Sequence, residues 1–172
     1  MVDTIVKRHG VGVSALMLML AAGLGLATTV RGGASVEDPS VAKARATVKM
    51  LDDLFKVAVV DITKRYDGPP AAKVAKTIFA AAKEKHYFQA RILDATGSPL
   101  NEANAPTDSF EKAAAKAMQD GKAYYEEVVG EGATRRLRAA TVVPAVVEKC
   151  AKCHGVKKGE LLGFLSYDLP LQ

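Results

Sequence analysis

Tryptophan is absent from this 172-residue chain, and aromatic residues make up only 6% of it. Proteins that bind single-stranded nucleic acid usually stack bases on aromatic side chains, so this scarcity argues against that function. The excess of basic residues is also small, with 24 lysines and arginines against 19 aspartates and glutamates. Because binding to phosphates needs a concentrated basic surface, a nucleic-acid partner is not expected.

Cysteine and histidine are scarce as well, with two and three residues respectively. Two cysteines are too few for a scaffold held together by disulfides. Hydrophobic residues at 49% and charged residues at 25% are ordinary globular values, which excludes disordered and low-complexity classes. The length suits one folded domain.

Residues 1–34 are typical of an export segment. Basic residues precede an uncharged, mostly apolar run at 11–30, and small residues ending at Ala34 follow. This order is that of a signal peptide cleaved after Ala34. A run of about 20 apolar residues can also span a bilayer as a retained anchor, so both interpretations stay open. In either case residues 35–172 are expected outside the cytoplasm, in the periplasm.

The rest of the sequence predicts helices first and a small sheet after them. Apolar residues recur in steps of three and four from 40 to 66, whereas a period of two appears from 87 to 93. The fold class is therefore α+β, an antiparallel sheet with a long N-terminal helix and flanking helices, which we expect on one side of the sheet. The expected helices are 40–66, 70–85, 108–121 and 145–154, and the expected strands are 87–93, 123–129, 134–143 and 161–169.

Three details of side-chain placement follow from the same patterns. Asp108, followed three residues later by Glu111, has the pattern of a capping box at a helix start. Ile78 and Phe79 are expected to be buried together on the second helix. Asp52, next to another aspartate, is expected on an exposed face.

One motif carries most of the functional information. Cys150-Ala-Lys-Cys153-His154 is the C-x-x-C-H pattern of covalent haem attachment. Two thiols three residues apart on one helical turn can each add to one vinyl group of a haem, and the next residue then offers its imidazole as proximal iron ligand. Because this attachment takes place outside the cytoplasm, the motif agrees with the export segment. We expect one haem c, bound to Cys150 and Cys153, ligated by His154, and inserted by haem-maturation machinery.

Other uses of the two cysteines fit less well. A plain disulfide would leave His154 without a role. A thioredoxin-like redox pair needs a βαβ context, whereas a β-hairpin is expected before Cys150. A zinc site needs two more ligands, and only His9 and His86 lie outside the motif, with His9 in the export segment.

The position of the motif excludes the commonest cytochrome arrangement. Class I c-type cytochromes carry the motif near the N-terminus and use a downstream methionine as second axial ligand, but no methionine follows Cys153 here. A cytochrome c′-like four-helix bundle carries the motif near its C-terminus and stays as an alternative, although the expected strands argue against it.

The stretch 138–155, followed by 159–166, resembles a family of PAS-like c-type haem domains first described as a domain of unknown function. The Asn/Pro-rich loop at 101–106 is also similar to a loop of that family, and the likeness extends over about 40–170. It implies a PAS-like sheet, a covalent haem and a proximal ligand that maps onto His154. Members of the family occur alone in bacterial periplasms or as the sensor end of membrane histidine kinases.

The sixth iron ligand does not carry over from this resemblance. A characterised type of the family uses a cysteine of the N-terminal helix, and this chain has none there. The candidates are Met50, His86, Met118, a lysine, or no residue at all. Met50 lies on the long helix beside Leu54 and Val57, where packing is the commoner role of a methionine. His86 lies between a helix and a strand, where a solvated helix end is the commoner setting.

Charged residues add weaker signals. Arg136 and Arg138 share one face of an expected strand and could pair with haem propionates or form a solvated face. Four lysines surround the motif and could steer an acidic redox partner towards it, or simply be soluble surface: Lys149, Lys152, Lys157 and Lys158.

The sequence therefore supports two functions. A periplasmic monohaem c-type protein would act in electron transfer or redox response with a redox partner protein. Alternatively, an open or labile sixth site would sense a diatomic gas or redox state and signal to a separate protein. No nucleophile–base pair or phosphate-binding loop is recognisable, so an enzyme is not expected. The long helix could also pair with a second copy in a homodimer.

Overall fold

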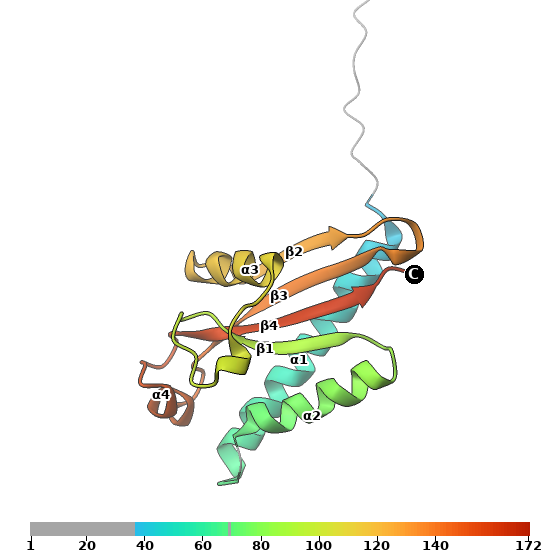
Figure 1. The fold of residues 1–172 in the computed structure, drawn as a ribbon. Coiled ribbons are helices and arrows are strands. Elements are labelled where there is room, and N and C mark those ends of the chain that lie inside the picture. The colour runs from blue at the N-terminus through green and yellow to red at the C-terminus, as the bar shows by residue number, and fades with distance from the viewer. Residues whose placement is uncertain (1–36, 69) are drawn as a thin grey trace, which may run out of the picture. The chain divides into compact units, whose positions relative to one another are not determined.

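An antiparallel sheet and helices make up the part of the chain that the computed structural model describes, residues 37–68 and 70–172 (Figure 1). The export segment predicted for 1–34 lies outside the described residues and stays a prediction. Among the described residues no helix is both long and apolar enough to cross a bilayer. In chain order the elements are α1 (Pro39–Arg65), α2 (Ala71–Glu84), β1 (Gln89–Asp94), the 3-10 helix η1 (Glu102–Asn104), α3 (Ser109–Gln119), β2 (Tyr124–Val129), the 3-10 helix η2 (Gly132–Thr134), β3 (Arg136–Pro144), α4 (Glu148–His154) and β4 (Leu161–Pro170).

The strands form one sheet in the order β1-β4-β3-β2, and every neighbouring pair is antiparallel. The predicted hairpin joins β2 to β3, and β4 inserts between β3 and the edge strand β1. In this register Phe164 of β4 lies opposite Leu93 of β1, and Leu165 lies opposite Thr141 of β3. The predicted α+β class, with flanking helices and a long N-terminal helix, is confirmed.

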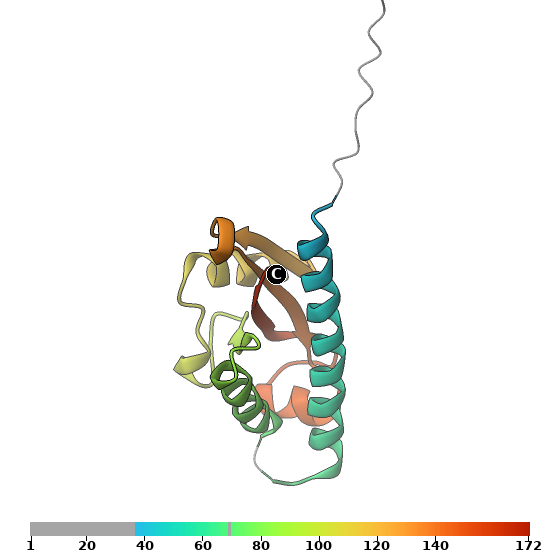
Figure 2. The same ribbon diagram turned by 90° about the vertical axis from the view of Figure 1, so that its right-hand side faces the viewer.

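Helices cover both faces of the sheet, so the prediction that they lie on one side is wrong (Figure 2). Leu137, Leu165 and Tyr167 point to the face covered by α1 and α2. Leu93 and Phe164 point to the opposite face, where they pack against α3. The reason lies in β4, which buries consecutive residues rather than alternate ones. A strand that is apolar on both faces needs cover on both.

Helix α1 confirms the predicted apolar stripe. Its residues Ala44 and Val48 are buried in the core against the sheet, and the ring of Phe55 meets that of Phe79 on α2 edge-on, with centroids 4.9 Å apart. With 27 residues the helix is about 40 Å long, whereas the ten residues of β4 span about 33 Å. The last turns of α1 are therefore available for contacts beyond the sheet.

Two of the predicted side-chain details are only half right. Phe79 is buried, but Ile78 is 45% exposed, because neighbouring helical positions point about 100° apart. Asp108 does cap α3 by accepting a hydrogen bond from the backbone N–H of Glu111 at 2.8 Å. The carboxylate of Glu111 does not return to Asp108. It is buried, accepts from the backbone N–H of Thr107 at 2.8 Å and pairs with Arg91.

Asp52 lies against the sheet, so its predicted exposure is wrong. Its Oδ1 accepts hydrogen bonds from the hydroxyl of Thr141 at 2.5 Å and from that of Tyr167 at 3.3 Å, and its Oδ2 pairs with Lys56 at 2.8 Å. Burial of the Tyr167 ring and the nearby Asp52 carboxylate both raise the pKa of the Tyr167 hydroxyl. This hydroxyl therefore stays a donor at all physiological pH values.

We expect Asp52→Ala to lower the free energy of unfolding by about 2–3 kcal/mol, because two largely buried hydroxyl groups lose their acceptor. Asp53→Ala is the matched control. Its side chain is 64% exposed and pairs with Lys49 on the same helix, so its loss should cost under about 0.5 kcal/mol. Urea unfolding of the two variants measures the difference, and equal costs would contradict the role given to Asp52.

Candidate functional site

The C-x-x-C-H motif forms α4, a seven-residue helix between β3 and β4. The helix ends at His154 because Gly155 adopts a left-handed conformation with φ 67° and donates its N–H to the carbonyl of Ala151. This conformation is strained for residues with a Cβ atom, so a glycine here sets the end of the helix. Ala151 is buried and anchors α4 on the domain.

The three motif side chains are accessible on α4. Both cysteines are free thiols, with Cys150 half-buried and Cys153 exposed, and His154 is exposed. Because residues three and four apart share a side of a helix, Cys150 lies next to both Cys153 and His154. The structure thus brings together the predicted attachment residues and the predicted proximal ligand.

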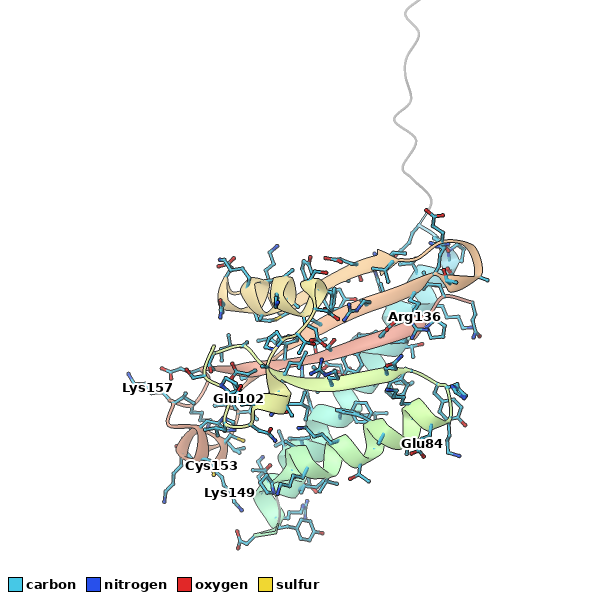
Figure 3. All side chains as sticks on the ribbon, in the orientation of Figure 1. Glu84, Glu102, Arg136, Lys149, Cys153 and Lys157 are labelled. Atoms are coloured by element: carbon cyan, nitrogen blue, oxygen red, sulfur yellow. The ribbon has the colours of Figure 1, made fainter. Side chains whose placement is uncertain are left out.

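An ion pair holds α4 against the end of α1. The Nζ atom of Lys149 lies 2.7 Å from a carboxylate oxygen of Asp67 and 3.0 Å from the carbonyl oxygen of Tyr66, both just after α1. The hydrogen bond from Lys149 lowers the pKa of the Asp67 carboxyl. Cys153 follows Lys149 by four residues, so it lies on the same side of α4 (Figure 3). One thiol of the motif therefore lies on the side of α4 that carries this ion pair.

A groove of about 420 Å³ lies between the last turns of α1 and the segment that enters α4. Valines form its apolar wall, two from each side of the groove. Lysines and one aspartate of α1 complete it, so positive charge borders an apolar surface. The lining residues are Lys56, Val57, Val60, Asp61, Lys64, Val146 and Val147.

A row of exposed apolar side chains on α1 leads into this groove. Met50, Leu54 and Val57 follow one another in steps of four and three and are 55%, 60% and 70% exposed. Three large apolar residues on one solvent-facing helix side are unusual for a soluble protein unless something covers them. Sequence reasoning missed the groove, although the second apolar row on this helix was a signal for it.

The residues around α4 fit a covalently bound haem. Two free thiols one turn apart, an adjacent imidazole and an apolar wall are what attachment, iron ligation and burial of a porphyrin face require. Lysines at the border of the groove suit carboxylate groups of the same ligand. A zinc site fits less well, because no three His, Cys, Asp or Glu side chains cluster anywhere in the described residues.

Of the candidates for the sixth ligand, the structure brings only lysines into this groove, Lys56 and Lys64, and not Met50, His86 or Met118. His86 precedes β1, whose Gln89 pairs with Asp168 at the end of β4, whereas α4 leads into the start of β4. The labelled Glu84, at the end of α2 just before His86, and Cys153 accordingly lie at opposite ends of the domain in Figure 3. Met118 is buried in the core under α3. Met50 shares the exposed side of α1 but lies about 10 Å along the helix from Val57.

The arginines suggested as propionate partners have other contacts. Arg136 pairs with Asp168, and Arg138 pairs with Asp108 at 2.8 Å. Both arginines lie on the α3 face of the sheet, because they alternate with Leu137, which faces α1. They do not line the groove.

Comparison with known proteins gives a family and a fold. Residues 33–163 match the family model described as Tll0287-like. A solved structure, the crystal structure of the cyanobacterial heme-protein Tll0287, superposes with a TM-score of 0.50 at 16% sequence identity, covering 80% of this chain and 98% of that chain. At this identity the superposition shows a shared fold. No curated protein matches the chain.

Proposed function

Because this chain belongs to the Tll0287-like family, we propose that it is an exported, non-enzymatic protein that carries one haem c. In this proposal the thiols of Cys150 and Cys153 hold the haem covalently and His154 is the proximal iron ligand. The protein then works in electron transfer or redox response in the periplasm. The related cyanobacterial heme-protein supports haem binding in this fold.

One observation carries the proposal: the two free thiols lie on the helix that directly follows Val146 and Val147, which line one side of an apolar groove. A porphyrin attached to α4 would cover the side chains of Val57 and Val147. Burying such apolar surface is worth about 25 cal/mol per Å². A haem attached to α4 would thus account both for the exposed apolar row on α1 and for the pair of free cysteines on α4.

The chain's own residues have distinct tasks at this site. The bound haem supplies reversible one-electron chemistry at its iron. His154 would offer a ring nitrogen to the iron, and Gly155 ends the helix directly after this residue. The valines would exclude water from a bound porphyrin, while the Asp52 carboxylate holds Lys56 at the border of the groove. Lys149 forms an exposed ion pair with Asp67 and so links α4 to the end of α1.

Electron exchange with a partner protein would use the exposed side of α4. Lys152, Lys157 and Lys158 are exposed around the motif. A cluster of positive side chains attracts an acidic partner and raises the association rate, most strongly at low ionic strength. We therefore propose weak docking of an acidic redox protein, or of a separate signalling protein, at this end of the domain.

The placement of the sixth-ligand candidates favours the sensor as a second function. Neither Met50 nor His86 lines the groove, whereas Lys64 does. A vacant site, or one held only by such a flexible lysine side chain, is more readily opened than one closed by a packed methionine or histidine. An open or labile sixth site of this kind would admit a diatomic gas.

Spectra and mass of the protein co-expressed with haem-maturation machinery test the proposal. We expect the mass of one haem to remain on the denatured chain. Low-spin bands that carbon monoxide does not change would favour electron transfer, and high-spin bands that it shifts would favour gas sensing. A denatured chain without added mass would overturn the assignment of covalent haem.

A further inference from the structure

A second cavity, of about 520 Å³, lies between α2, the edge strand β1 and the beginning of α3. It shares no lining residue with the groove beside α4. Its volume falls within the range of about 300–1,000 Å³ that is typical of small-molecule sites. It therefore needs an explanation of its own, independent of the haem.

Contacts with neighbouring residues fix the guanidinium groups of two arginines at this cavity. The guanidinium of Arg138 donates to Asp108 at 2.8 Å and stacks over the ring of Phe110 at 4.3 Å from its centroid. That of Arg91 pairs with the buried carboxylate of Glu111 and donates to the carbonyl of Ala103 at 3.4 Å. Such fixed guanidinium groups bind carboxylates well, because little side-chain entropy is lost on binding.

One donor at this cavity lacks an acceptor. A guanidinium carries five N–H donors, and the Nε atom of Arg138 is buried without a hydrogen-bond partner in the part of the chain that the structure describes. It is the one such side-chain atom found there. Buried donors are nearly always satisfied, so an acceptor beyond the described residues, from a ligand or an ordered water, is expected near this group.

The charges that line the cavity leave it positive. Its three carboxylates each pair with an arginine: Glu111 with Arg91, Asp108 with Arg138, and Asp168 with Arg136, which lies outside the lining. Two lysines of α2 remain, Lys76 and Lys83, and neither forms an ion pair within the described residues. Lys76 donates to the side-chain oxygen of Asn104 at 2.6 Å.

The cavity also has an apolar part, supplied by accessible or half-buried side chains of α2 and β1: Ala80, Ala90 and Ile92. Apolar walls with a few convergent polar groups are the usual composition of a site for a small organic molecule. An inorganic anion would use the charges but not these walls. The combination suits an organic acid with a short carbon chain.

We propose that this cavity binds a small organic carboxylate. Arg91 and Arg138 supply guanidinium N–H donors, Lys76 and Lys83 supply the uncompensated positive charge, and the apolar walls contact the carbon chain. The proposal does not rest on haem binding. It gives the domain a second, chemically distinct binding site, at the edge strand β1.

Thermal unfolding of the haem-loaded protein with acetate, succinate and citrate tests this inference. We expect at least one of these carboxylates to raise Tm by several degrees at saturation, because it binds the folded state. Sodium sulfate at the same ionic strength controls for general salt effects. The absorption spectrum recorded in parallel reports on haem separately.

Two α2 variants make the test specific. Lys83→Ala removes a charge from the cavity and should weaken carboxylate binding about fivefold, as the loss of one ion pair does. Lys73→Ala removes the same charge from an exposed position of the same helix that does not line the cavity, and should leave binding unchanged. No greater Tm rise with any carboxylate than with sulfate, or equal affinity in Lys83→Ala and wild type, would overturn the proposal.

Discussion

Replacing Cys150 and Cys153 together with alanine is expected to abolish covalent haem binding completely. Each thioether bond needs one of these thiols, and the chain has no other cysteine. A single replacement leaves one attachment point, so a smaller amount of haem should remain on the denatured chain. Mass spectrometry after denaturation measures the bound haem in all three variants.

The fold of the double-alanine variant should persist. Cys153 is exposed and Cys150 half-buried, so little packing is lost, and such surface changes usually cost within about 0.5 kcal/mol. Circular dichroism of the variant without haem checks this. Lys152→Ala is the matched control, because this exposed residue lies between the two cysteines and carries no thiol. Haem that stays on the denatured double variant would contradict the assignment.

Gly163→Ala is expected to destabilise the domain by about 3 kcal/mol or more. A Cβ atom at Gly163 would lie 2.1 Å from the carbonyl oxygen of Leu93 on the neighbouring strand. That oxygen is a backbone atom in the β1–β4 ladder, where Gly163 pairs with Asp94, so it cannot move away as a flexible side chain could. Relief requires β1 and β4 to separate, and overpacking of this kind costs about 1–3 kcal/mol even without loss of strand pairing.

Gly68→Ala is the matched control for this prediction. A Cβ atom at Gly68 would meet nothing within 4 Å, and its backbone is not left-handed. The change should be neutral or stabilise by up to about 1 kcal/mol, because alanine restricts the unfolded chain. Urea unfolding compares the two variants, and a Gly163→Ala protein as stable as Gly68→Ala would refute the steric argument.

The attachment residues could be predicted from the sequence because their chemistry depends on local spacing. Cys150, Cys153 and His154 lie within one helical turn and a half, so the motif sets their relative placement before any tertiary contact. The family resemblance could be recognised for the same reason, because it rests on the contiguous stretch 138–166, and the match to the family model confirms it. The haem itself stays a proposal.

The apolar groove next to the attachment helix could not be predicted in this way. Val57 and Val147 are far apart in the sequence, and nothing in the spacing of either segment says that they meet across a groove. The exposure of Met50 could not be predicted either, because its helix carries apolar residues on two sides. Periodicity identifies an apolar face but not what covers it.

The sequence by itself determined the α+β class, the order of the elements, the cap of α3 at Asp108 and the motif on α4, all of which follow from residues close together in the chain. Only the tertiary structure decided that helices cover both faces, that Asp52 joins Tyr167 across the α1–sheet interface, and that Arg91 and Arg138 share a cavity. The physical reason is the order and register of the strands in the sheet. The insertion of β4 between β1 and β3 brings distant side chains to common faces, and such pairing is set by the packing of the whole sheet.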